Sequence, residues 1–148
     1  MPTKSSERWI ADGNNVKEQL EKLGYKVDLQ YAEDDIPTQV NQIDNMITQG
    51  ADVLIIASID GTALTSQLES AAENGIPVIA YDRLILNTAD VDYYVAYDNF
   101  KVGQLQGQAL LDGLAANKPE GPYNVELFSG SSDDANSAVF FGGAMDVL

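Results

Sequence analysis

The sequence predicts an α/β fold in which a parallel sheet carries helices on both faces. Three times, about 25 residues apart, a predicted helix closes on a glycine and a short apolar run follows; these glycines are Gly24, Gly50 and Gly75. Glycine just past a helix end supplies the left-handed turn that other residues resist. The run Val53–Ile56 is continuously apolar, as in a buried parallel strand. Repeated helix–strand units of this size build a helix-covered parallel sheet.

The first two helices have clear apolar faces. A helix that begins near Ser6 carries apolar or small residues every three or four positions, at Trp9, Ile10, Gly13, Val16, Leu20 and Leu23. A strand over Tyr25–Tyr31 follows. The acidic pair Asp34–Asp35 before Ile36 and Pro37 favours a second helix start. The buried face of that helix is marked by Ile36, Val40, Ile43 and Ile47.

The middle of the chain contains the next two helix–strand units. A strand over Val53–Ala57 leads into a third helix, whose inward side chains are Leu64, Leu68, Ala71 and Ala72. Strand Pro77–Ala80 ends at Tyr81, Asp82 and Arg83, and a short strand over Tyr93–Ala96 comes next. In parallel sheets, ligands bind beyond the carboxyl ends of the strands, so these three residues are site candidates.

The last third begins with a helix that starts at Asp98–Asn99. Gly103 and Gly107, four residues apart, give this helix a small-residue stripe that allows close packing. After a turn-rich linker, Lys118–Pro122, we expect a strand over Tyr123–Phe128 and a last helix capped by Ser129–Asp134. A strand should precede the first helix and another should follow the last one, so we expect the chain to be part of a longer protein whose first strand is missing here.

Composition excludes several classes of function. The net charge is −15, with a pI near 4.1, which argues against nucleic acids and anionic membranes as partners. The absence of cysteine excludes disulfides and thiolate catalysis. No apolar run approaches the roughly 18 residues of a membrane span, so no direct membrane insertion is expected. The start Met1–Ser5 has no basic-then-apolar leader pattern.

Arg83 stands out among the charged residues. It is the only basic residue between Lys26 and Lys101, a window that holds thirteen carboxylates. A planar guanidinium at the end of a strand can grip a ligand through two parallel hydrogen bonds. The alternative is a structural ion pair with Asp82 or another neighbour.

Arg8 and Trp9 are expected at the same edge of the sheet, because the first helix starts where a strand should end. Arginine and carboxylate groups can bracket vicinal hydroxyls through charge-assisted hydrogen bonds, and an indole face can cover the C–H patches of a sugar. This combination favours a sugar site. The alternative for Trp9 is an ordinary core tryptophan.

Other chemistries find little support. The loop Ser129–Ser132 could bind an anion at a helix start, but Asp133 and Asp134 would repel a phosphate, so N-capping is the better interpretation. The acidic pairs have no third ligand at a calcium-loop spacing, and zinc would require His or Cys, so we predict no metal and no cofactor. The chain has no His, no Gly-x-Ser-x-Gly, no Walker loop and no Gly-x-Gly-x-x-Gly, so no catalytic residues are assigned.

Five segments resemble the multiple-sugar-binding receptors for glucose, galactose and xylose, which are type I periplasmic binding proteins. These segments are Pro2–Trp9, Ala57–Thr62, Val78–Ile85, Asp98–Gly103 and Glu126–Asn136. The resemblance implies flavodoxin-like lobes, with residues 1–98 forming most of the first lobe and 99–148 the opening of the second. It also implies a monosaccharide ligand, ABC importer subunits as partners, in some members a membrane sensor protein, and a periplasmic or otherwise extracytoplasmic location.

The resemblance also implies which residues contact the sugar. Arg8, Trp9, Asp82 and Arg83 would be contacts of the first lobe, and Asn136 would be a contact of the second. The family usually reads Gly-Gly-Ser-Pro-Asp-Asp-Asn-Asn in the last segment, where this chain has Ser129, Ser132 and Ala135 instead. If the missing asparagine is the one that binds, the contact in the second lobe is lost.

Two other classes of function remain open at this point. The sugar-sensing core of a LacI-like transcription regulator shares the fold, but would require a basic helix-turn-helix head. An acidic α/β enzyme or a phosphoacceptor would be revealed by sugar turnover or by phosphate transfer from acetyl phosphate.

Overall fold

The computed structural model describes residues 1–118 and 120–148; Pro119, in the predicted linker, lies outside the described residues. The chain forms two compact units, Met1–Val95 and Ala96–Leu148. Within the described ranges, no helix has both the length and the apolar character needed to cross a membrane.

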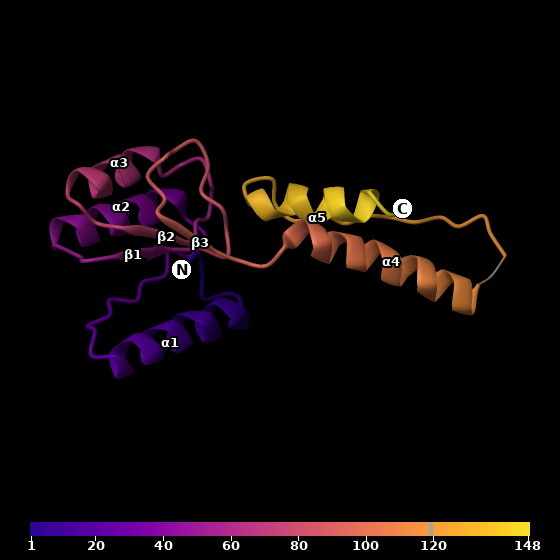
Figure 1. Cartoon of the computed structure of the whole chain (residues 1–148), viewed down its shortest axis with the longest axis horizontal. Coiled ribbons are helices and arrows are strands. Elements are labelled where there is room, and N and C mark those ends of the chain that lie inside the picture. Colours follow the sequence, from indigo (N-terminus) through magenta and orange to yellow (C-terminus); the bar gives the residue numbers. More distant parts are fainter. Residues whose placement is uncertain (119) are drawn as a thin grey trace. The chain divides into compact units, whose positions relative to one another are not determined.

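The first unit contains a three-stranded parallel sheet (Figure 1). Its strands are β1 (Leu54–Ile56), β2 (Val78–Tyr81) and β3 (Tyr93–Val95), in the order β1-β2-β3. Helices α2 (Ile36–Thr48) and α3 (Thr65–Glu73) lie on one side of the strands in Figure 1, and α1 (Glu7–Lys22) lies on the other. The predicted parallel sheet with helices on its faces is therefore confirmed.

The core of the first unit lies between the sheet and α2 and α3. Its buried residues are Ile43, Leu54, Ile56, Leu64, Leu68, Ala71, Ile76, Val78, Ala80 and Ile85. The predicted inward side chains of the third helix are confirmed at Leu64, Leu68 and Ala71. The prediction that Ala72 points inward is wrong: Ala72 directly follows the buried Ala71 on α3 and is exposed.

The predicted helix starts and glycine turns are confirmed. The carboxylate of Asp35 caps α2 by accepting a hydrogen bond of 2.8 Å from the backbone N–H of Thr38. Gly24, Gly50 and Gly75 have φ values of 93°, 75° and 69°, which side-chain-bearing residues adopt only with strain. Each reverses the chain at a helix end, so local residue choice sets these boundaries.

The predicted strand over Tyr25–Tyr31 is wrong, since this segment joins no sheet in the described chain. It instead borders the first residues of the protein: the Met1 amino group donates to Gln30 O at 2.9 Å, and Ala32 N–H donates to Met1 O at 3.1 Å. Helix α1 packs on this segment at Gly13, where an added Cβ would lie 2.6 Å from the Tyr31 hydroxyl. Leu23, the last residue of the predicted apolar stripe, is 73% exposed because it follows the end of α1.

The second unit consists of α4 (Asn99–Asn117), α5 (Ala135–Met145) and the segment between them. The two helices lie side by side at a stripe of glycines (Figure 1). A Cβ at Gly103 would lie 2.2 Å from Phe140 O, and one at Gly107 would lie 2.9 Å from Ala144 O. The predicted close approach at Gly103 and Gly107 is therefore confirmed, with α5 as the partner.

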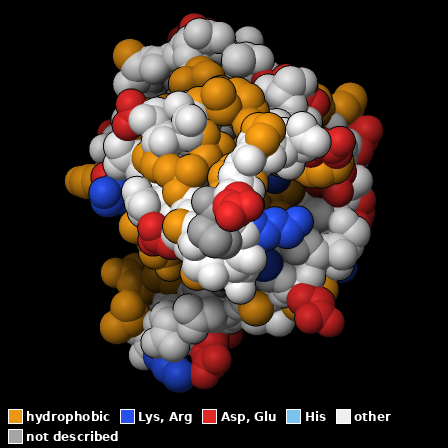
Figure 2. All heavy atoms as spheres, turned by 90° about the vertical axis from the view of Figure 1, so that its right-hand side faces the viewer, with side chains coloured by type: hydrophobic (Ala, Val, Ile, Leu, Met, Phe, Trp, Pro, Cys, Tyr) orange, Lys and Arg blue, Asp and Glu red, His pale blue; other side chains and the backbone are white. Residues whose placement is uncertain are grey.

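The predicted strand over Tyr123–Phe128 is wrong. The segment is extended but belongs to no sheet, and no strand lies in the described part of the second unit. Its alternate side chains line an open apolar groove with α4 and α5; the lining residues are Leu111, Leu114, Tyr123, Val125, Leu127, Met145 and Leu148. Figure 2 shows hydrophobic side chains exposed in several patches on one face of the molecule.

Candidate functional site

The site candidates of the first unit gather at the carboxyl end of β2. At Asp82 the backbone leaves the strand with a φ of 64°, in the left-handed region that aspartate tolerates better than most residues. The N–H of Asp82 donates to Val95 O at 2.7 Å, and the N–H of Arg83 donates to Tyr81 O at 2.7 Å. The Tyr94 hydroxyl also donates to Asp82 O at 3.3 Å. These bonds hold a strained turn, of the kind that concentrates at functional sites.

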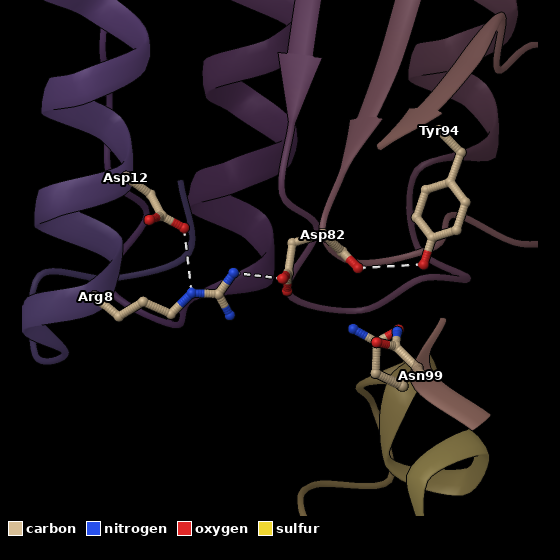
Figure 3. A network of polar contacts seen from close by, with 6 residues as sticks. Arg8, Asp12, Asp82, Tyr94 and Asn99 are labelled. Carbon is tan, nitrogen blue, oxygen red and sulfur yellow. Dashed lines mark hydrogen bonds and ion pairs between the residues drawn. The ribbon is translucent and has the colours of Figure 1, made fainter. Parts of the chain in front are cut away.

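Arg8 connects α1 to this turn. Its Nη2 donates to Asp82 Oδ1 in a close ion pair, and its Nε donates to Asp12 Oδ2 at 3.2 Å (Figure 3). The Arg8 side chain is 50% exposed and the Asp82 side chain 15% exposed. The hydrogen bond with Asp82 raises the pKa of Arg8 above its ordinary value, so the guanidinium carries its positive charge throughout the physiological pH range.

The guanidinium groups of Arg8 and Arg83 both lie over the ring of Trp9. The Arg8 guanidinium carbon lies 4.4 Å from the centroid of the indole ring, and that of Arg83 lies 5.3 Å from it. Both distances are within the range of cation–π attraction. Trp9 is only 6% exposed, as expected for a core tryptophan, and both guanidinium groups lie against its ring.

Arg83 also holds the loop that follows β1. Its Nη1 donates to Ser58 O at 3.1 Å and to Ile59 O at 3.5 Å. The buried Gln39 holds the same loop from α2: its amide donates to Ala57 O at 3.0 Å and accepts from Ile59 N–H at 2.9 Å. The carboxyl ends of β1 and β2 are therefore joined through side chains.

Tyr81 is the last residue of β2 and directly precedes Asp82 in the chain. Burial is the main cause that raises the pKa of its phenol, and the Asp12 carboxylate raises it further. Tyr81 therefore stays protonated and neutral at neutral pH.

Asn136 belongs to the second unit. It is buried in the first turn of α5, where its Oδ1 accepts a hydrogen bond of 2.9 Å from Asn99 Nδ2 on α4. Its backbone N–H donates to Asp134 Oδ1 at 3.0 Å. The contacts of Asn136 thus join the starts of α4 and α5.

The structure brings four of the five predicted residues together, namely Arg8, Trp9, Asp82 and Arg83. Sequence reasoning missed Asp12, Gln39 and Tyr94. The four-residue step from Arg8 to Asp12 on a helix was the available signal for Asp12. Within residues 1–118 and 120–148, no group of three or more His, Cys, Asp or Glu side chains could hold a metal ion.

Comparison with known proteins places this chain in a family. A model described as "Periplasmic binding protein domain" matches residues 1–148, the whole chain. The chain belongs to the periplasmic binding protein family.

Relatives within this family include sugar receptors. The chain is 57% identical over 148 residues to the multiple sugar-binding periplasmic receptor ChvE of Rhizobium radiobacter, covering 100% of this chain and 42% of that protein. It is 44% identical over 142 residues to the D-xylose-binding periplasmic protein of Escherichia coli, covering 96% of this chain and 41% of that protein. The chain therefore spans about two fifths of the length of these curated relatives.

A solved structure shows the same fold. An ABC transporter solute-binding protein from Clostridium phytofermentans, with β-D-glucose bound, matches with a TM-score of 0.96 at 51% identity. The match covers 100% of this chain and 46% of that one. The type I periplasmic binding protein fold expected from the resemblance is thus confirmed.

Proposed function

We propose that this chain is part of a non-enzymatic binding protein for a monosaccharide, an aldopyranose such as glucose, galactose or xylose. The observation that carries the proposal is the charged cluster at the carboxyl end of β2, where Arg8 pairs with Asp82 over the buried Trp9 and Arg83 lies beside them. Carboxylate and guanidinium groups side by side supply both acceptors and donors, which vicinal sugar hydroxyls require.

In this proposal, residues 1–98 provide most of the first sugar-binding lobe, and residues 99–148 form the first part of the second lobe. Arg8, Trp9, Asp82 and Arg83 contact the sugar from the first lobe, and Asn136 contacts it from the second. The names of the relatives support a periplasmic location and service to an ABC importer. A membrane sensor is a further proposed partner, by the resemblance stated above.

Arg83 provides the test. In the protein as its gene encodes it, Arg83→Lys should weaken sugar binding by about 1.5–3 kcal/mol, because lysine loses the planar fork and its charge-assisted hydrogen bonds. Calorimetric titration with glucose, galactose and xylose measures this loss. Lys17→Gln, which alters an exposed pair on α1, is the matched control and should leave the affinity unchanged.

Thermal melting separates this proposal from the structural alternative. Arg83 also donates to the loop after β1, so the substitution could act through the fold. Unchanged affinity together with a large fall in Tm would show that Arg83 only holds the loop, and would overturn its role in binding.

A further inference from the structure

Arg8 is held by two carboxylates that approach different edges of its guanidinium. Asp82 accepts from Nη2, and Asp12, one helical turn further along α1, accepts from Nε (Figure 3). A guanidinium has five N–H groups in a rigid plane, so two bonds at different edges set both its place and its rotation. The other N–H groups of the Arg8 guanidinium, which bond neither Asp12 nor Asp82, then point in a defined direction.

Asp12 is less exposed than Arg8, its partner on α1. The Asp12 side chain is only 25% exposed, and its carboxylate, in addition to burial, raises the pKa of the Tyr81 phenol at the end of β2. Asp12 and Asp82 therefore hold the Arg8 side chain between the first turns of α1 and the turn that follows β2.

The other ion pairs of α1 are more exposed than Asp12, and both partners of each pair lie on the helix itself. Lys17–Glu21 and Lys22–Glu18 have the same four-residue spacing, but their side chains are between 41% and 63% exposed, whereas Asp12 is 25% exposed and Arg8 50%. Exposed ion pairs of this kind contribute little to the stability of the folded protein. The pair of Arg8 with Asp12 differs because Arg8 also pairs with Asp82 at the end of β2.

We propose that Asp12 is a positioning residue for sugar recognition: it acts through Arg8, orienting the guanidinium so that its remaining N–H groups meet the sugar hydroxyls. The inference rests on the proposed function. Asp12 is a different kind of residue from the five proposed contacts, because it touches Arg8 rather than the sugar.

A double-mutant cycle tests this role by calorimetry, in the protein as its gene encodes it. Asp12→Asn keeps the volume of the side chain, removes its charge, and should weaken sugar binding about five- to tenfold. In the Arg8→Met background the same change should have no further effect. Glu18→Gln is the matched control, since it removes one carboxylate from the same helix, and it should leave the affinity unchanged.

A second readout needs no sugar. Trp9 is the sole tryptophan of the 148-residue chain, and the Arg8 guanidinium lies 4.4 Å from its ring. Asp12→Asn should therefore change the part of the emission that Trp9→Phe removes, and the change should vanish in the Arg8→Met background. Glu18→Gln should leave the emission unchanged in both backgrounds.

The two readouts distinguish the ways in which the inference can fail. If Asp12→Asn leaves both the affinity and the emission unchanged, or weakens binding equally with and without Arg8, Asp12 does not act through Arg8. If Arg8→Met leaves the affinity unchanged while the emission responds as expected, Asp12 positions Arg8 but Arg8 does not bind sugar. That result overturns the role in recognition together with the assignment of Arg8 to the site.

Discussion

The two units respond differently to the same sequence signal. Val53–Ile56 and Tyr123–Phe128 are both apolar-rich segments that predict strands. In the first unit, β1 pairs with β2, and Leu54 and Ile56 are 2% and 5% exposed. In the second unit, Val125 and Leu127 are each 44% exposed, and no strand lies beside them in the described chain.

The difference shows that a strand requires a neighbour as well as a suitable sequence. Backbone N–H and C=O groups of an extended segment are satisfied by another segment, whereas a helix satisfies them within itself. The first unit supplies partners for β1, and α2 and α3 cover it. The described second unit supplies two helices, which pack on each other through glycines.

The largest expected effect contrasts two leucines on helices of the two units. Leu68 on α3 is fully buried, whereas Leu105 on α4 is 58% exposed. Leu68→Ala should destabilise the first unit by about 2–5 kcal/mol, since it leaves a cavity in the core. Leu105→Ala should have little effect. Amide hydrogen exchange should show lost protection in β1, β2 and α3 only for Leu68→Ala; equal losses for both variants would contradict the contrast.

An intermediate effect is expected at the glycine stripe. In Gly103→Val the new Cβ would lie 2.2 Å from Phe140 O, and helix backbones cannot give way cheaply. We expect a destabilisation of about 1–3 kcal/mol, confined to α4 and α5, in the same exchange experiment. Gly113→Ala is the control on α4, because none of the described residues outside its own helix lies within 4 Å of its Cβ position and alanine favours a helix. Normal protection of α4 and α5 in Gly103→Val would mean that the helices do not pack at this stripe.

The smallest expected effect concerns the cap of α2. Hydrogen bonds from Thr38 lower the pKa of Asp35, so the folded state favours the ionised carboxylate. The cap therefore stabilises the protein above the ordinary aspartate pKa, and this contribution is lost as the pH falls through the lowered value. Asp35→Ala should lower the Tm by a few degrees at neutral pH, and by less in acid. A difference that stays constant in acid would show that the charge of the cap contributes nothing.

Much of the first unit could be predicted because its signals are local. The cap of α2 at Asp35 and the turns at Gly24, Gly50 and Gly75 depend on neighbouring residues, and the structure confirms them. The prediction that Arg8 and Asp82 lie close together followed from the rule that sites lie at the carboxyl ends of parallel strands.

The sequence by itself determined the helices, the glycine turns and the family to which the chain belongs, because these follow from short-range patterns and recognisable motifs. Only the tertiary structure decided that Tyr25–Tyr31 and Tyr123–Phe128 join no sheet within the described residues, since ladder hydrogen bonds depend on segments distant in sequence. It also decided that Asp12 shares Arg8 with Asp82, because a side chain on α1 and another after β2 meet only when the chain has folded.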